Sequence, residues 1–206
     1  VIWAIRTPKL TSDRSGYGQV VPLLDPPNNM LRMIWHSPAG SVSAPFAPVF
    51  MGQKETPYEF QQHRYLTSGE DTKFMDNSER IHGFSEQMSN VDQDVEASRS
   101  AVYEAKRLLY LMLRDKDKYT TEILETFENH EAELKAHVNI VLRAAELLLR
   151  ENEKEEARSL LTYFSNKSLL SGLDLMIKLS ESIEIRSQLK PRKGKTRNFK
   201  MYNQLW

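Results

Sequence analysis

Arg6 is the residue whose position best suits it for chemistry. It ends the apolar run over residues 1–5, which predicts a strand, so it stands at a strand end. An arginine that leaves a buried strand needs an anionic or carbonyl partner, because an unpaired buried charge is costly. The alternative is a strand-end arginine in water. Arg6 is therefore the candidate for anion or carbonyl binding.

Two tryptophans and a His-Ser pair are the next candidates. Trp3 and Trp35 are candidates for lining a substrate pocket, although aromatic residues of a sheet more often belong to its core. His36 and Ser37 are adjacent. Because adjacent side chains of a strand point to opposite faces, we expect that they do not act as one relay.

The common catalytic and metal-binding motifs are missing. The sequence has no GxSxG, Walker, HExxH or GxGxxG pattern, and Gly16-Tyr17-Gly18 is interpreted as a turn. His130 and His137 are seven residues apart, about 10 Å along a helix, which makes a poor metal site. We interpret Glu131 and Glu133 beside them as surface charges. The prediction is therefore no metal site and no cofactor.

Composition excludes further classes of function. The chain has no cysteine, so it contains no disulfide, zinc-thiolate site or cysteine nucleophile of its own. The 28 basic and 28 acidic side chains cancel, which argues against binding to nucleic acid or an anionic membrane. We expect no membrane span and no signal peptide, and hence a soluble protein, cytoplasmic or exported. Because the sequence opens inside a predicted strand, we also expect a fragment or a processed product.

Proline divides the chain into a β-rich and a helical part. Eight of the nine prolines lie at or before Pro57, so residues 1–52 are predicted as short antiparallel strands and turns. Pro45 and Pro48 make residues 42–51 an edge or irregular strand. Residues 53–94 are polar and poorly periodic, and we expect an irregular connection with one short helix at most.

Residues 95–190 have the periodicity of helices. Four apolar stripes predict four helices, with Asp117 and Thr120 or Thr121 as caps between the first two. The stripes centre on residues 102–113, 123–149, 160–164 and 169–183. A basic tail over residues 191–206 follows, suited to docking on an acidic or phosphate-bearing partner, or to balancing acidic segments elsewhere.

Several segments together resemble the cysteine dipeptidases related to dipeptidase A and the secernins, a family of N-terminal-nucleophile hydrolases. The likeness lies in a strand ending in arginine, paired strands ending in "PxxxG", a helix start similar to "SxxWxxKRL", and a segment similar to "LTxYTN". In this sequence they are residues 1–6, 35–38 with 41–52, 97–108 and 160–166.

The resemblance implies the C-terminal part of an αββα sandwich, in which two antiparallel sheets are covered by helices. It also implies amide hydrolysis by an N-terminal cysteine, which this chain lacks. The nucleophile would come from the N-terminal part of the same protein or from another chain. Arg6 would then hold the thiolate or the substrate carboxylate. The expected partners are a peptide or small amide substrate and that N-terminal part, with a homo-oligomer as a further option.

A second interpretation stays open. The chain would then be a non-enzymatic helical interaction module, with the β-rich part as scaffold and the basic tail as docking element. Binding of nucleic acid through the tail is a third and weaker option, because the whole chain is neutral.

Overall fold

The computed structural model describes residues 17–23, 26–61 and 100–188 of the 206 residues. Within these ranges the fold is α+β, as predicted, with a small antiparallel sheet followed by long helices. The elements are β1 (Gly18–Val20), the 3-10 helix η1 (Asn29–Leu31), β2 (Met33–Ser37), β3 (Ala47–Phe50), α2 (Tyr58–Gln61), α5 (Ala101–Arg114), α6 (Lys116–Arg150) and α7 (Lys154–Gln188). The predicted strand over residues 1–6 and the tail over 191–206 lie outside the described residues.

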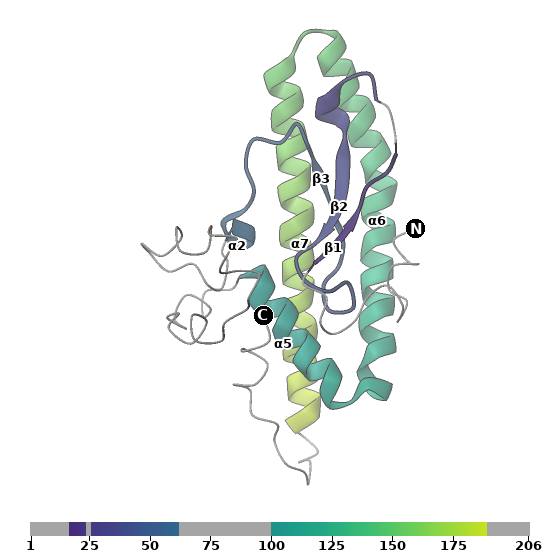
Figure 1. Ribbon diagram of the computed structural model, residues 1–206, viewed down its shortest axis with the longest axis vertical. Coiled ribbons are helices and arrows are strands. Elements are labelled where there is room, and N and C mark those ends of the chain that lie inside the picture. Colours follow the sequence, from purple (N-terminus) through teal and green to yellow (C-terminus); the bar gives the residue numbers. More distant parts are fainter. Residues whose placement is uncertain (1–16, 24–25, 62–99, 189–206) are drawn as a thin grey trace, which may run out of the picture.

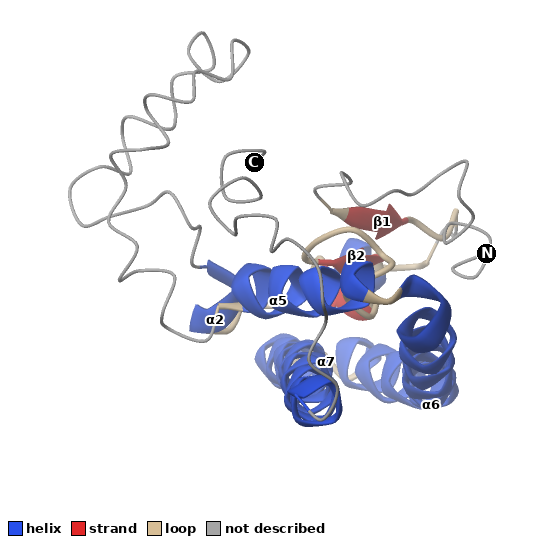
Figure 2. Ribbon diagram, turned by 90° about the horizontal axis from the view of Figure 1, so that it is seen from below, coloured by secondary structure: helices blue, strands red, loops and turns tan. Residues whose placement is uncertain are grey.

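The three described strands form one sheet in the order β1-β2-β3, with antiparallel pairing throughout. The register places His36 of β2 opposite Gln19 of β1 and Ala47 of β3. The strands run alongside α6 and α7 (Figure 1), and β1 lies farther from these helices than β2 does (Figure 2). Among the described strands β3 is an edge strand, which confirms the prediction made from its prolines.

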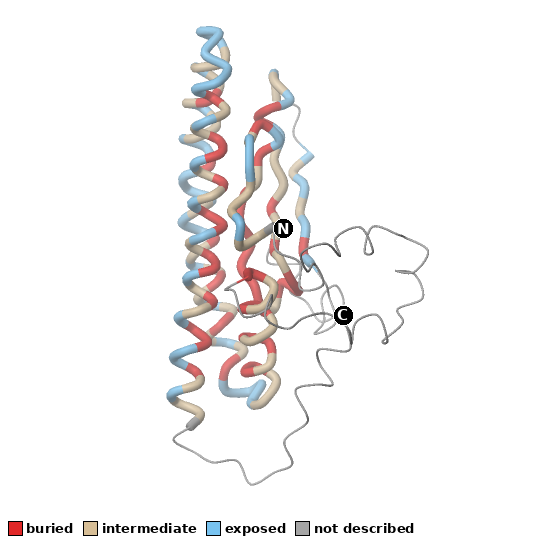
Figure 3. Tube along the Cα trace, turned by 90° about the vertical axis from the view of Figure 1, so that its left-hand side faces the viewer, coloured by how far each residue is buried: buried red, intermediate tan, exposed pale blue. Residues whose placement is uncertain are grey.

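The two faces of the sheet have different surroundings. The first face carries Val20, Met33, Trp35, Phe46 and Phe50, which pack with α6 and α7 in one hydrophobic cluster. The helix residues of this cluster are Leu134, Val138, Val141, Leu142, Ala145, Leu149, Leu160, Leu161 and Phe164. Figure 3 shows the strands standing beside the helix layer. The first face is therefore the one that the helices cover.

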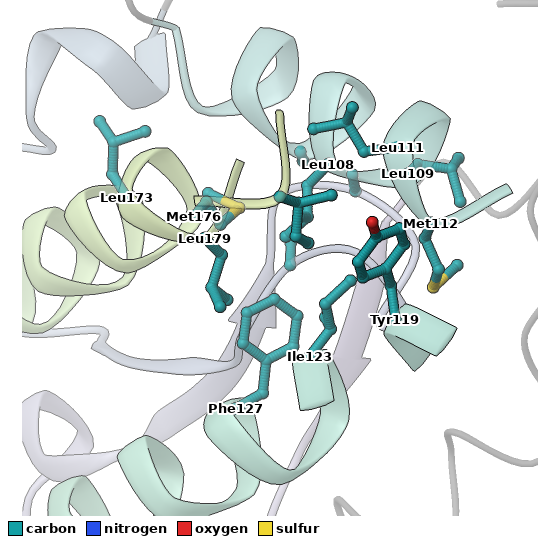
Figure 4. Close-up of a cluster of buried hydrophobic side chains, with 14 of the residues drawn as sticks. Leu108, Leu109, Leu111, Met112, Tyr119, Ile123, Phe127, Leu173, Met176 and Leu179 are labelled. Carbon is teal, nitrogen blue, oxygen red and sulfur yellow. The ribbon is translucent and has the colours of Figure 1, made fainter. Parts of the chain in front are cut away.

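A second cluster holds the three long helices together. Side chains of α5, α6 and α7 converge in it, among them Leu108, Phe127 and Met176 (Figure 4). At its rim the Arg107 guanidinium donates to Glu184 of α7 at 2.8 and 2.9 Å and to Glu104 at 3.0 Å. Ser100 caps α5 by accepting the Tyr103 N–H, so the segment that resembles "SxxWxxKRL" does contain a helix start.

Two helical predictions were wrong in their boundaries. The stripes over 160–164 and 169–183 belong to one helix, α7, because the polar residues between them continue it: the Ser168 hydroxyl donates to the Phe164 carbonyl one turn back. Asp117 and the two threonines do not cap α6. The helix already begins at Lys116, and Asp117 lies in its first turn, where a carboxylate is favourable beside the helix dipole.

A tight turn joins α6 to α7 and makes them an antiparallel pair. Asn152 has a φ of 64°, in the left-handed region that asparagine tolerates better than most residues. The Glu153 N–H donates to the Leu148 carbonyl at 2.8 Å and closes the end of α6. Among the described helices, none combines the length and apolar character needed to cross a membrane.

Candidate functional site

The outer edge of β3 is sealed by side chains of the two long helices. The Phe46 N–H donates to Glu131 Oε1 of α6 at 2.8 Å, and the Phe50 N–H donates to Ser165 Oγ of α7 at 3.3 Å. Pro48, between them, has no N–H to satisfy. We call this the sealed edge. It cannot accept another strand, because its donors are used and buried.

The chain just beyond β3 is fixed on α7 as well. The Lys54 N–H donates to Thr162 Oγ1 at 2.9 Å. Gly52 lies so close to its neighbours that an added Cβ would meet Leu161 Cδ1 at 2.9 Å and Met30 Cβ at 2.8 Å. Glycine at this position therefore permits the close approach of the strand end to the helix.

The opposite side of the sheet, which we call the second face, carries Gln19, Ile34, His36, Ala47 and Val49. None of these five belongs to either hydrophobic cluster formed by the described residues. Three of the five are apolar, and they occupy β2 and β3, while Gln19 is exposed on β1. The second face therefore combines an apolar area with a polar corner at Gln19 and His36.

His36 is separated from Ser37, as predicted. The Ser37 hydroxyl is buried on the first face, 3.1 Å from both the Ala39 and the Ala44 carbonyl oxygens. His36 points to the second face, where burial lowers the pKa of its ring below the ordinary 6.5. A neutral imidazole can accept or donate a hydrogen bond at physiological pH, but it has no hydroxyl partner in Ser37.

A second histidine lies at the junction of α6 and α7. His130 Nε2 is 3.4 Å from the Ser171 hydroxyl, and burial lowers the pKa of the ring. The Ser171 hydroxyl is closer to the Ser168 carbonyl, at 3.0 Å, which takes its proton in the ordinary helical manner. This pair therefore links two helices and is not arranged as an activated nucleophile, which needs its proton directed at the base.

The predicted site residues have different outcomes. Arg6 and Trp3 lie outside the described residues. Trp35 is 5% exposed and packs in the cluster between the sheet and the helices, which is the core alternative considered for it. The described part of the chain therefore offers no support for substrate contact by Trp35.

Glu131 was wrongly interpreted as a surface charge. It is 6% exposed, and its carboxylate accepts the Phe46 N–H at the sealed edge. The signal that could have revealed it is its spacing: it lies four residues after Phe127 and seven before Val138, on the apolar stripe of α6. A carboxylate on the buried stripe of a helix needs a buried donor.

Hollows lined by described residues lie beside α7 and at the end of β1. One, of about 760 Å³, lies beside α7 and includes Lys54, Thr162 and Asn166. The other, of about 500 Å³, lies at the end of β1 and includes Met33, Ile34 and Leu142. Within the described ranges no three His, Asp or Glu side chains are grouped closely enough to hold a metal ion.

Three comparisons with known proteins gave no match to this chain. No protein-family model, curated protein or solved structure matches this chain. The functional conclusions therefore rest on the residues themselves, on the contacts of the sealed edge and on the second face.

Proposed function

We propose that this chain is the C-terminal part of a cysteine amidohydrolase of the N-terminal-nucleophile type, acting as a dipeptidase. In this reaction the thiolate attacks the carbonyl carbon of an amide, and the amine leaves with a proton. Water then hydrolyses the thioester, which returns the thiolate and releases the acid. The thiolate would be supplied by sequence that precedes Val1 or by another chain, because these 206 residues contain no cysteine.

The observation that carries the proposal is a contact between two segments of the resemblance. The "PxxxG" segment ends at Gly52, and the "LTxYTN"-like segment spans residues 160–166. These segments are more than 100 residues apart, yet Ser165 accepts the Phe50 N–H and Thr162 accepts the Lys54 N–H. Gly52 packs against Leu161. Of the residues that match these motifs, Gly52, Leu161 and Thr162 take part in the contacts between strand end and helix, which supports a shared fold.

The second face gives further support. An αββα sandwich needs a sheet with helices on one face and a second sheet on the other. Here α6 and α7 pack on the first face, whereas Ile34, Ala47 and Val49 on the second face belong to neither cluster of the described residues. Ala47 is already buried, whereas Ile34 and Val49 are partly exposed, and a second sheet contributed by the N-terminal part is their proposed cover.

The complete protein provides the test. Its open reading frame should continue upstream of Val1 and encode a cysteine that becomes N-terminal on processing. The complete protein should hydrolyse dipeptides, and alkylation with iodoacetamide should abolish the activity. A reading frame that begins near Val1, with no second chain supplying a cysteine, would refute the proposal.

Arg6 is tested in the same protein. Arg6→Ala should lower turnover by at least about ten-fold, the value of one charge-assisted hydrogen bond, with little change in the free energy of unfolding. Arg6→Lys keeps the positive charge but loses the bidentate hydrogen-bond geometry. Its turnover should therefore lie between that of the parent protein and that of Arg6→Ala. Unchanged turnover with a large loss of stability would make Arg6 a structural residue.

The alternative, a helical interaction module, has one observation in its favour. Ile140 and Leu147 are 66% and 61% exposed and seven residues apart on the outer side of α6. Such spacing gives a helix an apolar stripe that another helix can cover. This interpretation predicts a stable complex that survives deletion of residues 1–6 and is lost in Ile140→Glu/Leu147→Glu, measured by light scattering after size-exclusion chromatography.

A further inference from the structure

The outer side of α6 carries a second stripe, which faces away from the core. Val138 packs in the core, whereas Ile140, two residues later and about 200° around the helix, is exposed. The stripe repeats at alternating intervals of four and three residues, which is the spacing of a helix that pairs with another helix. We call this stripe the outer seam, and its members, all exposed, are Asn129, Glu133, Ala136, Ile140, Arg143 and Leu147.

No described element covers the outer seam. In the view along the helices, α6 lies at the lower right margin of the described elements (Figure 2). Among the described residues, neither the Glu133 carboxylate nor the Arg143 guanidinium has a salt-bridge partner. The seam therefore presents apolar side chains together with an anion and a cation that no described residue neutralises.

The seam is complementary to itself when two copies of α6 run antiparallel about Val138. Glu133 and Arg143 lie at equal distances along the helix on either side of Val138, so Glu133 of each copy then faces Arg143 of the other. Ile140 faces Ala136 in the same register, and a large side chain opposite a small one lets two helices pack closely. Both charged positions of the seam thus meet the opposite charge.

A parallel pairing in register lacks this complementarity. It would set Glu133 against Glu133 and Arg143 against Arg143, and like charges at an interface disfavour that partner. The charges of the seam therefore select the antiparallel arrangement, in which the two copies are related by a two-fold axis and present the same surface to each other.

From this complementarity we infer that the outer seam binds a second copy of this chain, as an antiparallel dimer through α6. At the ends of the seam Leu147 faces Asn129, which is polar but uncharged, and the contact extends over about 27 Å of helix. Such a contact is small, so dimerisation should be weak and visible only at high micromolar concentrations. The dimer is independent of the proposed hydrolysis, and it names a partner for the interaction-module alternative.

Charge reversal on the full chain tests the dimer. Sedimentation equilibrium should show association that increases with concentration. Glu133→Arg and Arg143→Glu should each weaken it by at least about ten-fold, because each turns two attractive pairs into two repulsive ones. The double variant Glu133→Arg/Arg143→Glu restores opposite charges at both positions and should dimerise within about three-fold of the parent chain.

Mixing the two single variants gives a sharper result. In a heterodimer of Glu133→Arg with Arg143→Glu, each basic position faces an acidic one, so the mixture should associate although neither variant does so alone. The variants differ in mass, and native mass spectrometry can therefore distinguish the heterodimer from either homodimer. A mixture that stays monomeric would overturn the antiparallel register.

Two further variants complete the test. Ile140→Glu places a charge in the apolar part of the seam and should abolish association, whereas Lys135→Glu reverses an exposed charge of the same helix outside the seam and should not change it. Circular dichroism shows whether each variant folds. A parent chain that remains monomeric at submillimolar concentration, or equal losses in Ile140→Glu and Lys135→Glu, would overturn the inference. Either result leaves the proposed hydrolysis standing, since no step of it needs a second copy.

Discussion

The two edges of the described sheet are built in different ways. At the β3 edge, Glu131 and Ser165 accept the outward N–H groups, and Pro48 takes the position between them. At the β1 edge, the strand has only three residues, and Gln19 is exposed. The helices thus close one edge with buried, directed hydrogen bonds, while no described helix packs closely on β1.

This difference shows where the fold is fixed and where it can be extended. A buried N–H without an acceptor costs about 1–3 kcal/mol, so the contacts of the sealed edge define the position of β3 on the helices. The β1 edge and the second face carry no such contacts from the described helices. The proposed sandwich would add a further sheet on that side.

The largest expected effect is at the sealed edge. Phe46 is fully buried on the first face, where its ring reaches toward Gly18 of β1, so Phe46→Ala should lower the free energy of unfolding by about 3–5 kcal/mol. Urea unfolding followed by circular dichroism measures it. Tyr58→Ala, an exposed aromatic, is the control and should cost less than about 0.5 kcal/mol. Similar losses for both would contradict the packing.

Replacement of the buried carboxylate tests the seal directly. Glu131→Leu leaves the Phe46 N–H without this acceptor and should cost about 1–3 kcal/mol, whereas Glu131→Gln keeps an acceptor oxygen and should cost less. Glu133→Leu changes an exposed carboxylate of the same helix and serves as the matched control. If Glu131→Leu unfolds at the urea concentration of the parent chain, the hydrogen bond contributes nothing.

Acidification should weaken the sheet and the helix junction together. Burial lowers the pKa of both His36 and His130 below 6.5, so the folded chain binds fewer protons than the unfolded chain. The contribution of the two neutral histidines to the free energy of unfolding is therefore fully present above about pH 6.5. It is lost as the pH drops through 6.5 toward the pKa values of the folded chain. Urea midpoints between pH 7.5 and 5 measure this.

Two substitutions test whether His36 and His130 cause the pH dependence of the free energy of unfolding. His36→Gln and His130→Gln should each flatten part of the dependence, whereas His137→Gln, on an exposed position of α6, should leave it unchanged. A pH dependence that survives in the double variant would assign it to other groups.

The smallest effect is expected at the β1 edge. Gln19→Lys places a charge on an exposed position of the second face and should change the free energy of unfolding of this chain by less than about 0.5 kcal/mol. In the complete protein the proposed second sheet would cover this face, so the same substitution should be more costly there. Equal, small effects in both would argue against the sandwich.

Local patterns accounted for much of the fold. The prolines predicted a β-rich part and an edge strand, and β3 is an edge strand of the described sheet. The apolar stripes predicted helices over residues 95–190, and helices cover most of residues 101–188, although the break predicted between two of them was wrong. Serines such as Ser168 look like a helix end in sequence but bond to the preceding turn in α7. The opposite directions of His36 and Ser37 also followed from sequence alone, because alternation is a property of every strand.

Periodicity and proline content by themselves determined that a β-rich part precedes a helical part and that His36 and Ser37 point to opposite faces. Only the tertiary structure decided that Glu131 is buried, that Trp35 belongs to the core and that one edge of the sheet is closed by helices. The reason is distance along the chain. Phe46 and Glu131 are 85 residues apart, and Phe50 and Ser165 are 115 apart. A hydrogen bond between such residues leaves no mark in the local pattern around either of them.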